Sequence, residues 1–319
     1  MRNSLSRKVA GFACAALAAF AALAVRAEQI SVTHWGVLMY GAPYAVAMEK
    51  GYFKEAGLNI DGILTSKGGG TTMRNVLAGG IPYGEVALPA ALAAIKQGID
   101  VRIIHAGVRT AGEILWVTLP DSPVKSLKDL QGRKMGITSP KSVTEMLAIM
   151  SLQAQGIPLD KVSLVAVGGI GSGLTALQQG GIAAAPIMDP IWTKEKAKYR
   201  PVFHVKDVLP PITQTVGVTT AEFAKGNGQK LKAIVAGRRK GVDFIYANPN
   251  EAAAIVAKAY NMDLKVVEES IANLVALKYW SPGEFELESM NNMVKGLQIM
   301  GEWSGPVEWD KLIDPSFLK

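Results

Sequence analysis

The chain has 319 residues, of which 49% are hydrophobic and 19% charged, and its formal net charge is +7. This composition excludes a disordered chain, and the length suits one large domain or two lobes of ordinary size. Four of the basic residues lie in the first 27 positions, which contain no acid, so the rest of the chain carries 30 basic against 27 acidic residues. That near-neutral balance removes the main argument for binding nucleic acid.

The first 27 residues have the three parts of a secretory signal peptide. A basic start precedes an unbroken apolar run, Val9–Val25, and Val25-Arg26-Ala27 places small residues at positions −3 and −1 of a cleavage site. A retained membrane anchor is one alternative, but the run is short for a span and rich in alanine. A lipid anchor at Cys14 is another, but too few apolar residues precede that cysteine. We expect cleavage after Ala27 and a periplasmic protein.

Cys14 is the only cysteine, so the mature chain of about 292 residues has none. It can form no disulfide, no thiolate metal site and no thiol nucleophile. The three histidines show no metal-binding spacing, and no Gly-x-Ser-x-Gly nucleophile motif occurs. We therefore expect no catalytic residues, no cofactor and no metal.

Apolar periodicity predicts alternating strands and helices in the first part of the chain, the pattern of a parallel sheet covered on both faces. The predicted strands are Gln29–Trp35, Ile60–Thr65, Glu85–Leu88, Val101–Ala106 and Ile114–Leu119. The predicted helices between them are Pro43–Ala56, Thr71–Leu77 and Pro89–Gln97.

The alternation restarts after residue 133, and a helical region follows it. The predicted strands are Lys134–Thr138, Val162–Val167, Ala183–Met188, Val202–Val205 and Thr213–Thr219, with helices Pro140–Gln155, Ser172–Gln179 and Pro190–Lys198. The chain beyond Ala221 reads as helices Gln229–Ala247, Pro249–Ala259, Leu264–Leu277 and Pro282–Met300.

A short internal echo favours two similar halves. Val76–Ile81 and Leu177–Ile182 share the pattern apolar-x-x-Gly-Gly-Ile, in which a helix ends at glycine and an apolar strand follows. Ordinary helix-to-strand connections give the same pattern, so six residues do not establish a duplication.

Several motifs, in order along the chain, resemble one family. Ala42–Leu58 reads as a helix followed by Gly-Tyr-Phe-Lys-Glu-Ala-Gly-Leu, and Ser122–Gly136 reads Ser-Pro-x-x-Ser-Leu-x-Asp-Leu-x-Gly-x-x-x-Gly. The glycine-rich turn and helix Gly68–Leu77 and the pair Asp189-Pro190 also fit. Over about Ile30–Leu277 the chain is similar to the substrate-binding proteins of ABC importers for alkanesulfonates, taurine, nitrate and thiamine pyrimidine precursors.

The resemblance implies an α/β fold, the two-lobed type II periplasmic binding protein, with two crossover hinge strands and a helical C-terminal extension. Lobe one would comprise residues 28–115 plus 216–319, and lobe two residues 116–215. The family's function is to capture a small-molecule ligand by closure and deliver it to an ABC permease in the inner membrane. Pro82, Ala183 and Asp189 depart from the family's usual residues, which leaves the ligand open.

In open α/β sheets, ligands bind beyond the carboxyl ends of the strands. Those ends are rich in Gly, Ser and Thr here, and several lead into helix starts, where backbone N–H groups favour an anion. The candidate ligand-binding residues are Trp35, Tyr40, Gly70, Thr71, Thr72, Leu88, Arg109, Ser139, Ser142, Thr144, Asp189 and Trp192.

Each candidate also has a structural explanation. Ser139 is placed to cap a helix that starts at Pro140, with Ser142 in its first turn. Arg109 is placed either to clamp a carboxylate or sulfonate with two hydrogen bonds or to form an inter-lobe ion pair. Asp189 either accepts a hydrogen bond from a ligand or caps its helix. The aromatic residues offer either stacking surfaces or core packing.

We therefore predict an exported, monomeric protein that binds a small organic anion, an aromatic carboxylate or a sulfonate, and binds no nucleic acid. The basic cluster Arg238-Arg239-Lys240 is interpreted as a solvated helix face. One alternative is a periplasmic sensor that docks a receptor. Another is a pyrimidine-precursor enzyme of the same fold, but the known enzyme of that kind depends on a cysteine-rich segment, which this chain lacks.

Overall fold

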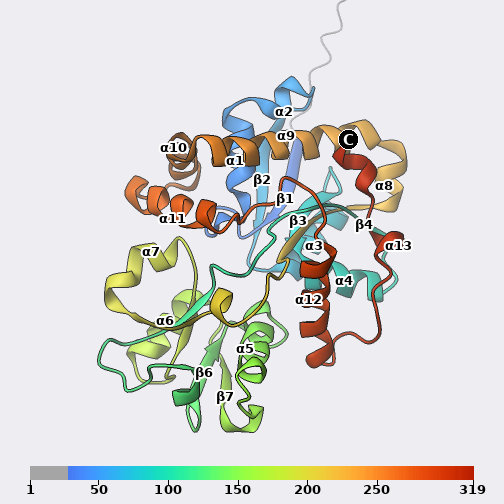
Figure 1. Cartoon of the computed structure of the whole chain (residues 1–319). Helices are drawn as coiled ribbons and strands as arrows, with labels where there is room; N and C mark the ends of the chain where they lie inside the picture. Colours follow the sequence, from blue (N-terminus) through green and yellow to red (C-terminus); the bar gives the residue numbers. More distant parts are fainter. Residues whose placement is uncertain (1–27) are drawn as a thin grey trace, which may run out of the picture.

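The computed structural model describes residues 28–319. The predicted signal peptide and Cys14 lie outside the described residues. Three β-sheets form the centres of two lobes, one sheet in the first and two in the second, and the lobes lie one above the other in Figure 1. Among residues 28–319, no helix is long and apolar enough to cross a membrane.

Lobe one contains a five-stranded sheet in the order β2-β1-β3-β10-β4. Strand β1 runs parallel to β2 and β3, whereas β10 runs antiparallel to β3 and β4. The strands are β1 Glu28–Thr33, β2 Ile60–Ser66, β3 Tyr83–Ala87, β4 Val101–Ala106 and β10 Thr215–Thr220. The helices between them are α1 Ala42–Glu49, α2 Tyr52–Glu55, α3 Gly69–Ala78 and α4 Leu88–Lys96.

Lobe two is built on the antiparallel sheet β8-β5-β9 and the parallel pair β6-β7, which a bridge between Met135 and Ala184 brings together. Its strands are β5 Leu115–Thr118, β6 Lys134–Ile137, β7 Ser163–Ala166, β8 Ala185–Ile187 and β9 Arg200–His204. Its helices are α5 Val143–Ala154, α6 Ile170–Gln178 and α7 Ile191–Glu195.

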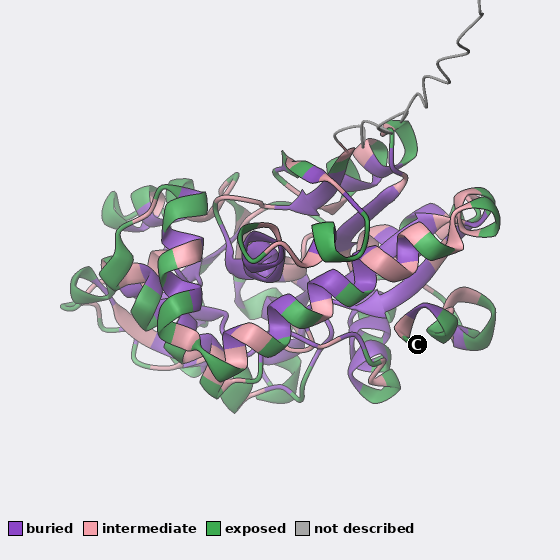
Figure 2. Cartoon of the chain, turned by 90° about the horizontal axis from the view of Figure 1, so that it is seen from above, coloured by how far each residue is buried: buried purple, intermediate pink, exposed green. Residues whose placement is uncertain are grey.

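The C-terminal part is helical, as the sequence predicted. Helices α9 and α10 lie over lobe one, whereas α12 extends beside both lobes (Figure 1). The helices are α8 Ala221–Gly226, α9 Gly228–Ala247, α10 Pro249–Tyr260, α11 Leu264–Ala276, α12 Leu287–Ile299 and α13 Trp309–Leu312. Buried residues follow the inward faces of the helices, and exposed residues follow the outward faces (Figure 2).

Two segments cross between the lobes, one from β4 to β5 and one from β9 to β10. They lie side by side, because the backbone N–H of Gln214 donates to Val108 O at 2.8 Å and that of Gly107 donates to Thr215 O at 2.9 Å. The α/β class, the two lobes and the helical C-terminal region predicted from the sequence are thereby confirmed.

Local boundaries differ from the prediction in three informative places. The single helix predicted over Pro43–Ala56 is two, because Gly51 adopts a left-handed conformation (φ 76°) that ends α1. Helix α5 starts at Val143 rather than Pro140, because Lys141 is left-handed (φ 62°); Ser142, not Ser139, caps it. Helix α6 starts at Ile170, two residues earlier than predicted.

Candidate functional site

A cavity of about 1060 Å³ lies between the two lobes, at the carboxyl ends of β1, β2, β3, β6, β7 and β8. This is the edge of the sheets at which the sequence predicted ligand binding. Both crossing segments contribute to its wall through Ile114 and Gln214, so the cavity adjoins the connection between the lobes.

One helix from each lobe begins at the cavity after a glycine and has no side-chain cap. Gly68 precedes α3 in lobe one and Gly169 precedes α6 in lobe two, and both have extended backbones (φ 170° and 168°). The first backbone N–H groups of such a helix have no partner within the helix, and the helix dipole makes this end positive. The cavity is therefore bordered from both lobes by groups that attract an anion.

The charged side chains around the cavity are mostly basic. Lys67 and Arg74 come from the region of α3, Lys96 from α4 and Lys141 from the turn before α5, and Glu302 is the one acid that residues 28–319 contribute to the lining. Lys141 Nζ lies 2.9 Å from Glu302 Oε1, so part of this charge is already paired. The remaining excess of positive charge complements an anionic ligand.

A chain of hydrogen bonds runs from the cavity into the buried connection between the lobes. Tyr40 donates to Gln214 Oε1 at 3.1 Å, and Gln214 Nε2 donates to Thr110 O and to Glu113 Oε1, both at 2.7 Å. Glu113 also accepts from Tyr279 at 3.3 Å. Burial raises the pKa of Glu113 to about 8, although the hydrogen bonds from Gln214 and Tyr279 act against that shift.

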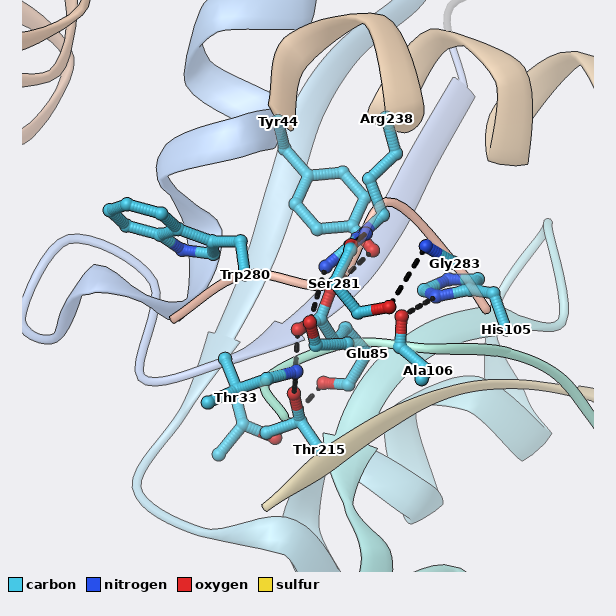
Figure 3. Close-up of polar contacts among 12 residues, drawn as sticks. Thr33, Tyr44, Glu85, His105, Ala106, Thr215, Arg238, Trp280, Ser281 and Gly283 are labelled. Carbon is cyan, nitrogen blue, oxygen red and sulfur yellow. Dashed lines mark hydrogen bonds and ion pairs between the residues drawn. The ribbon is translucent and has the colours of Figure 1, made fainter. Parts of the chain in front are cut away.

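A buried ion pair between Glu85 and Arg238 lies beside the cavity wall in lobe one (Figure 3). Glu85 accepts from Arg238 Nε, from Tyr44 Oη and from Thr215 Oγ1 at 2.7–2.8 Å. Arg238 also donates to the backbone oxygens of Ser281 and Gly107. Burial alone would raise the pKa of Glu85, but Arg238, His105 and the hydrogen bonds from Arg238 and Thr215 together outweigh it and hold that pKa below its ordinary value.

The prediction that Arg238 belongs to a solvated helix face is therefore wrong. Lys240 is exposed and pairs with Glu55, and Arg239 is partly exposed and pairs with Glu284, whereas Arg238 points inward from the same helix. Successive residues of a helix point in directions about 100° apart, so adjacent basic residues need not share a surface.

Six of the twelve predicted site residues line the cavity together: Tyr40, Gly70, Thr71, Ser139, Ser142 and Thr144. The first three come from lobe one and the others from lobe two. Ser142 also caps α5, because its Oγ accepts from Glu145 N at 3.2 Å. The capping role predicted for Ser139 thus belongs to Ser142, in addition to its place at the cavity.

Three other predicted residues are packed within lobe one. The Trp35 ring packs in a T-shaped arrangement against the Tyr260 ring, with ring centroids 4.9 Å apart. Trp35 also lines a separate hollow. Thr72 is buried and hydrogen-bonds the cavity residue Thr33 at 2.7 Å. Leu88 is wholly buried in the core.

The remaining three predicted site residues make their contacts outside the cavity. Arg109 Nη1 forms an ion pair with Glu286 Oε1 at 3.1 Å, and Trp192 is partly buried and packs against the core of lobe two. Asp189 Oδ1 accepts from Thr193 N and Oγ1, so it caps α7, while its Oδ2 accepts from Asn273 of α11 at 3.2 Å. Neither Arg109 nor Asp189 is part of the cavity lining.

Sequence reasoning did not select several cavity residues. Gln214 stands outside any motif, and Lys67, Arg74 and Lys96 read as ordinary surface charges. Glu302 and Trp303 belong to the C-terminal region, which the sequence presented as helical packing. Lys67 and Arg74 could have been selected from their position in the sequence, beside the glycine-rich start of α3.

Comparisons with known proteins agree with this architecture. A family described as "NMT1/THI5 like" matches residues 39–252, about two thirds of the chain. A "putative binding protein" of Brucella abortus is 24% identical over 244 residues, which cover 75% of this chain and 73% of the relative.

Two solved structures resemble the whole described chain. The periplasmic aliphatic sulphonate binding protein SsuA of Escherichia coli has 15% identity and a TM-score of 0.73, over 90% of this chain and 91% of that one. The desulfurization enzyme DSZB has 14% identity and a TM-score of 0.67, over 91% and 97%. The family resemblance predicted from the motifs is confirmed: the chain belongs to the NMT1/THI5-like family and has the periplasmic binding protein fold.

Proposed function

We propose that this protein is an exported solute-binding protein that captures a small organic anion, an aromatic carboxylate or a sulfonate, and delivers it to an ABC permease. The observation that carries the proposal is the cavity between the lobes, which combines uncapped helix starts from both lobes with four basic side chains and one acid. Its structural relatives include a protein that binds aliphatic sulphonates.

The cavity favours an organic anion over a small inorganic one. Its wall includes Leu38, Leu92, Ile114, Met188 and Ile191 between the polar groups. Pockets that bind organic ligands combine apolar walls with a few placed polar groups in this way. An anion with a carbon body satisfies both kinds of surface.

The mechanism is closure of the lobes around the ligand. Tyr40, Gly70 and Thr71 would bind from lobe one, and Ser139, Ser142 and Thr144 from lobe two. A ligand that contacts both lobes binds the closed arrangement more tightly than the open one and shifts the population toward it. The permease in the inner membrane would recognise the closed form. The predicted signal peptide would place the protein in the periplasm, on the side of the membrane where the two can meet.

Two other functions use the same cavity. A sensor would bind the same ligand but dock a receptor, and co-purification with the permease separates the two. An enzyme is suggested by the desulfurization neighbour. The enzyme is the less favoured alternative because residues 28–319 contain no cysteine. This excludes catalysis by a thiol but not reactions that need none. Product formation from a bound anion, followed by NMR, would favour the enzyme.

The test is the thermal stability of residues 28–319 with matched pairs of compounds: benzenesulfonate against benzenesulfonamide, and benzoate against benzamide. Each pair has nearly the same shape and differs in charge. An anion at 100 times its Kd adds about 2.7 kcal/mol of stability, which raises the Tm by several degrees. Equal shifts from both members of each pair, or shifts from the neutral compounds alone, would contradict the anion assignment.

A further inference from the structure

The cavity has a third wall that belongs to neither predicted group of binding residues. Leu297, at the end of α12, and Glu302 and Trp303, which follow it, line the cavity together with residues of the two lobes. Leu297 is 6% exposed, and Trp303 is partly buried and packs against the main core. This wall presents an alkyl and an aromatic side chain to a cavity whose four basic side chains come from other elements.

A tight turn brings these three residues together. Gly301 adopts a left-handed conformation (φ 72°), which ends the helix and reverses the chain. The backbone N–H groups of Glu302 and Trp303 then donate to Leu297 O at 2.9 and 3.3 Å. The turn therefore places Trp303 against Leu297 rather than further along the helix axis.

The wall is attached to both lobes. The Glu302 carboxylate pairs with Lys141 of lobe two at 2.9 Å, and its backbone oxygen accepts from Lys96 of lobe one at 2.8 Å. Helix α12 also packs closely on α5, because Gly296 leaves no room for a Cβ atom beside the Met146 sulfur. A wall held at this many points has a defined position relative to the cavity.

We propose that Leu297 and Trp303 are specificity-determining residues, which contact the carbon body of the bound anion and select ligands with a large apolar group. The inference rests on the proposed function and adds the selectivity of the site. Burial of an aromatic body against such side chains strengthens binding by at least tenfold, whereas a one-carbon anion has too little apolar surface to gain from it.

The test compares two pairs of anions by calorimetry: methanesulfonate with 2-naphthalenesulfonate, and acetate with 2-naphthoate. The wild-type protein is expected to prefer the larger member of at least one pair by tenfold or more. Leu297→Ala and Trp303→Ala are expected to reduce that preference at least fivefold, mainly through weaker binding of the larger anion. Trp303→Phe retains an aromatic ring, so it should retain most of the preference.

The matched control is Ile299→Ala, which removes an apolar side chain from the same helix where it is 43% exposed and outside the cavity lining. Circular dichroism melts establish that each variant is folded. If the wild type binds no anion, the proposed function fails and the inference fails with it. If anions bind but the wild type shows no size preference, or if folded Leu297→Ala and Trp303→Ala proteins both keep the wild-type preference, only the inference is overturned.

Discussion

Arg238 Nε donates to Glu85 Oε2 at 2.8 Å, and the two side chains are 1% and 0% exposed. An ion pair this deep costs much desolvation energy, so its net contribution to stability is small while both partners are present. Removal of one partner leaves the other as a buried, uncompensated charge. The pair also fixes the backbone of Gly107, where one crossing segment leaves lobe one.

We expect Arg238→Met to destabilise the protein by about 3–5 kcal/mol, measured by urea unfolding, because Glu85 loses its counter-charge. Arg239→Met is the matched control, since its pair with Glu284 is about half exposed and should contribute less than about 1 kcal/mol. The double variant Arg238→Met/Glu85→Gln should recover part of the loss. Equal effects of the two arginine substitutions would refute this account.

Glu113 predicts a pH dependence of stability. Its pKa in the folded protein is about 8, well above the ordinary value of 4.5, so the folded state holds a proton that the unfolded state releases between these values. The contribution to stability is complete below about pH 4.5 and is lost as the pH rises through 8.

Glu113→Gln should therefore flatten the fall in unfolding free energy between pH 5 and 8, which one such group can make as steep as about 1.4 kcal/mol per pH unit. Unfolding in urea at several pH values provides the measurement. Glu288→Gln, an exposed substitution at the start of α12, is the control. The same slope in wild type and Glu113→Gln would show that Glu113 does not titrate in this range.

Arg74 tests the electrostatic part of the proposed site. It is exposed at the cavity, and its Nη2 donates to Thr71 Oγ1 at 2.8 Å. Arg74→Gln should weaken binding of benzenesulfonate or benzoate several-fold at low salt and less at high salt, since mobile ions screen exposed charges. Arg133→Gln, which removes an exposed arginine outside the lining, should leave the Kd unchanged. A salt-independent loss would point to altered packing instead.

The contact between Asp189 and Asn273 joins α7 of lobe two to α11 of the C-terminal region. Asn273→Ala removes a hydrogen bond to a mostly buried carboxylate, which is typically worth about 1.5–3 kcal/mol. If the bond forms only in the closed arrangement, the Kd for the anion should rise about tenfold. The exposed substitution Asn250→Ala serves as control. Unchanged affinity with lower stability would mean that the bond persists when the lobes separate.

The elements that the sequence predicted well are those with strong local signals. Helix α10 starts at Pro249 as expected, and strand β4 has the predicted bounds, Val101–Ala106, because an apolar run lies between clear turn residues. The cavity edge followed from the same alternation, since carboxyl ends of parallel strands meet at one edge. Tyr40 and Thr71 were accessible to this reasoning because Tyr40 lies in the connection that follows β1 and Thr71 lies in the first turn of α3.

The residues that sequence reasoning missed depend on contacts far apart in the chain. Gln214 becomes important only when the crossing segments bring it beside Tyr40 and Glu113. Arg238 looked like a surface residue because its partner, Glu85, is 153 positions away. Asp189 had the expected chemistry, but its direction was set by packing against α11. The local sequence pattern locates the helix or strand that carries such a residue, but it does not give the direction of the side chain.

Glu302 has a consequence for how the cleft opens. Its carboxylate is bonded to a lysine of one lobe and its backbone oxygen to a lysine of the other. Any movement that carries Lys96 and Lys141 apart by more than the length of these side chains must break one of the two bonds. Separation of the lobes therefore changes the contacts of Glu302. A spectroscopic probe placed beside this residue would report which lobe the C-terminal turn moves with.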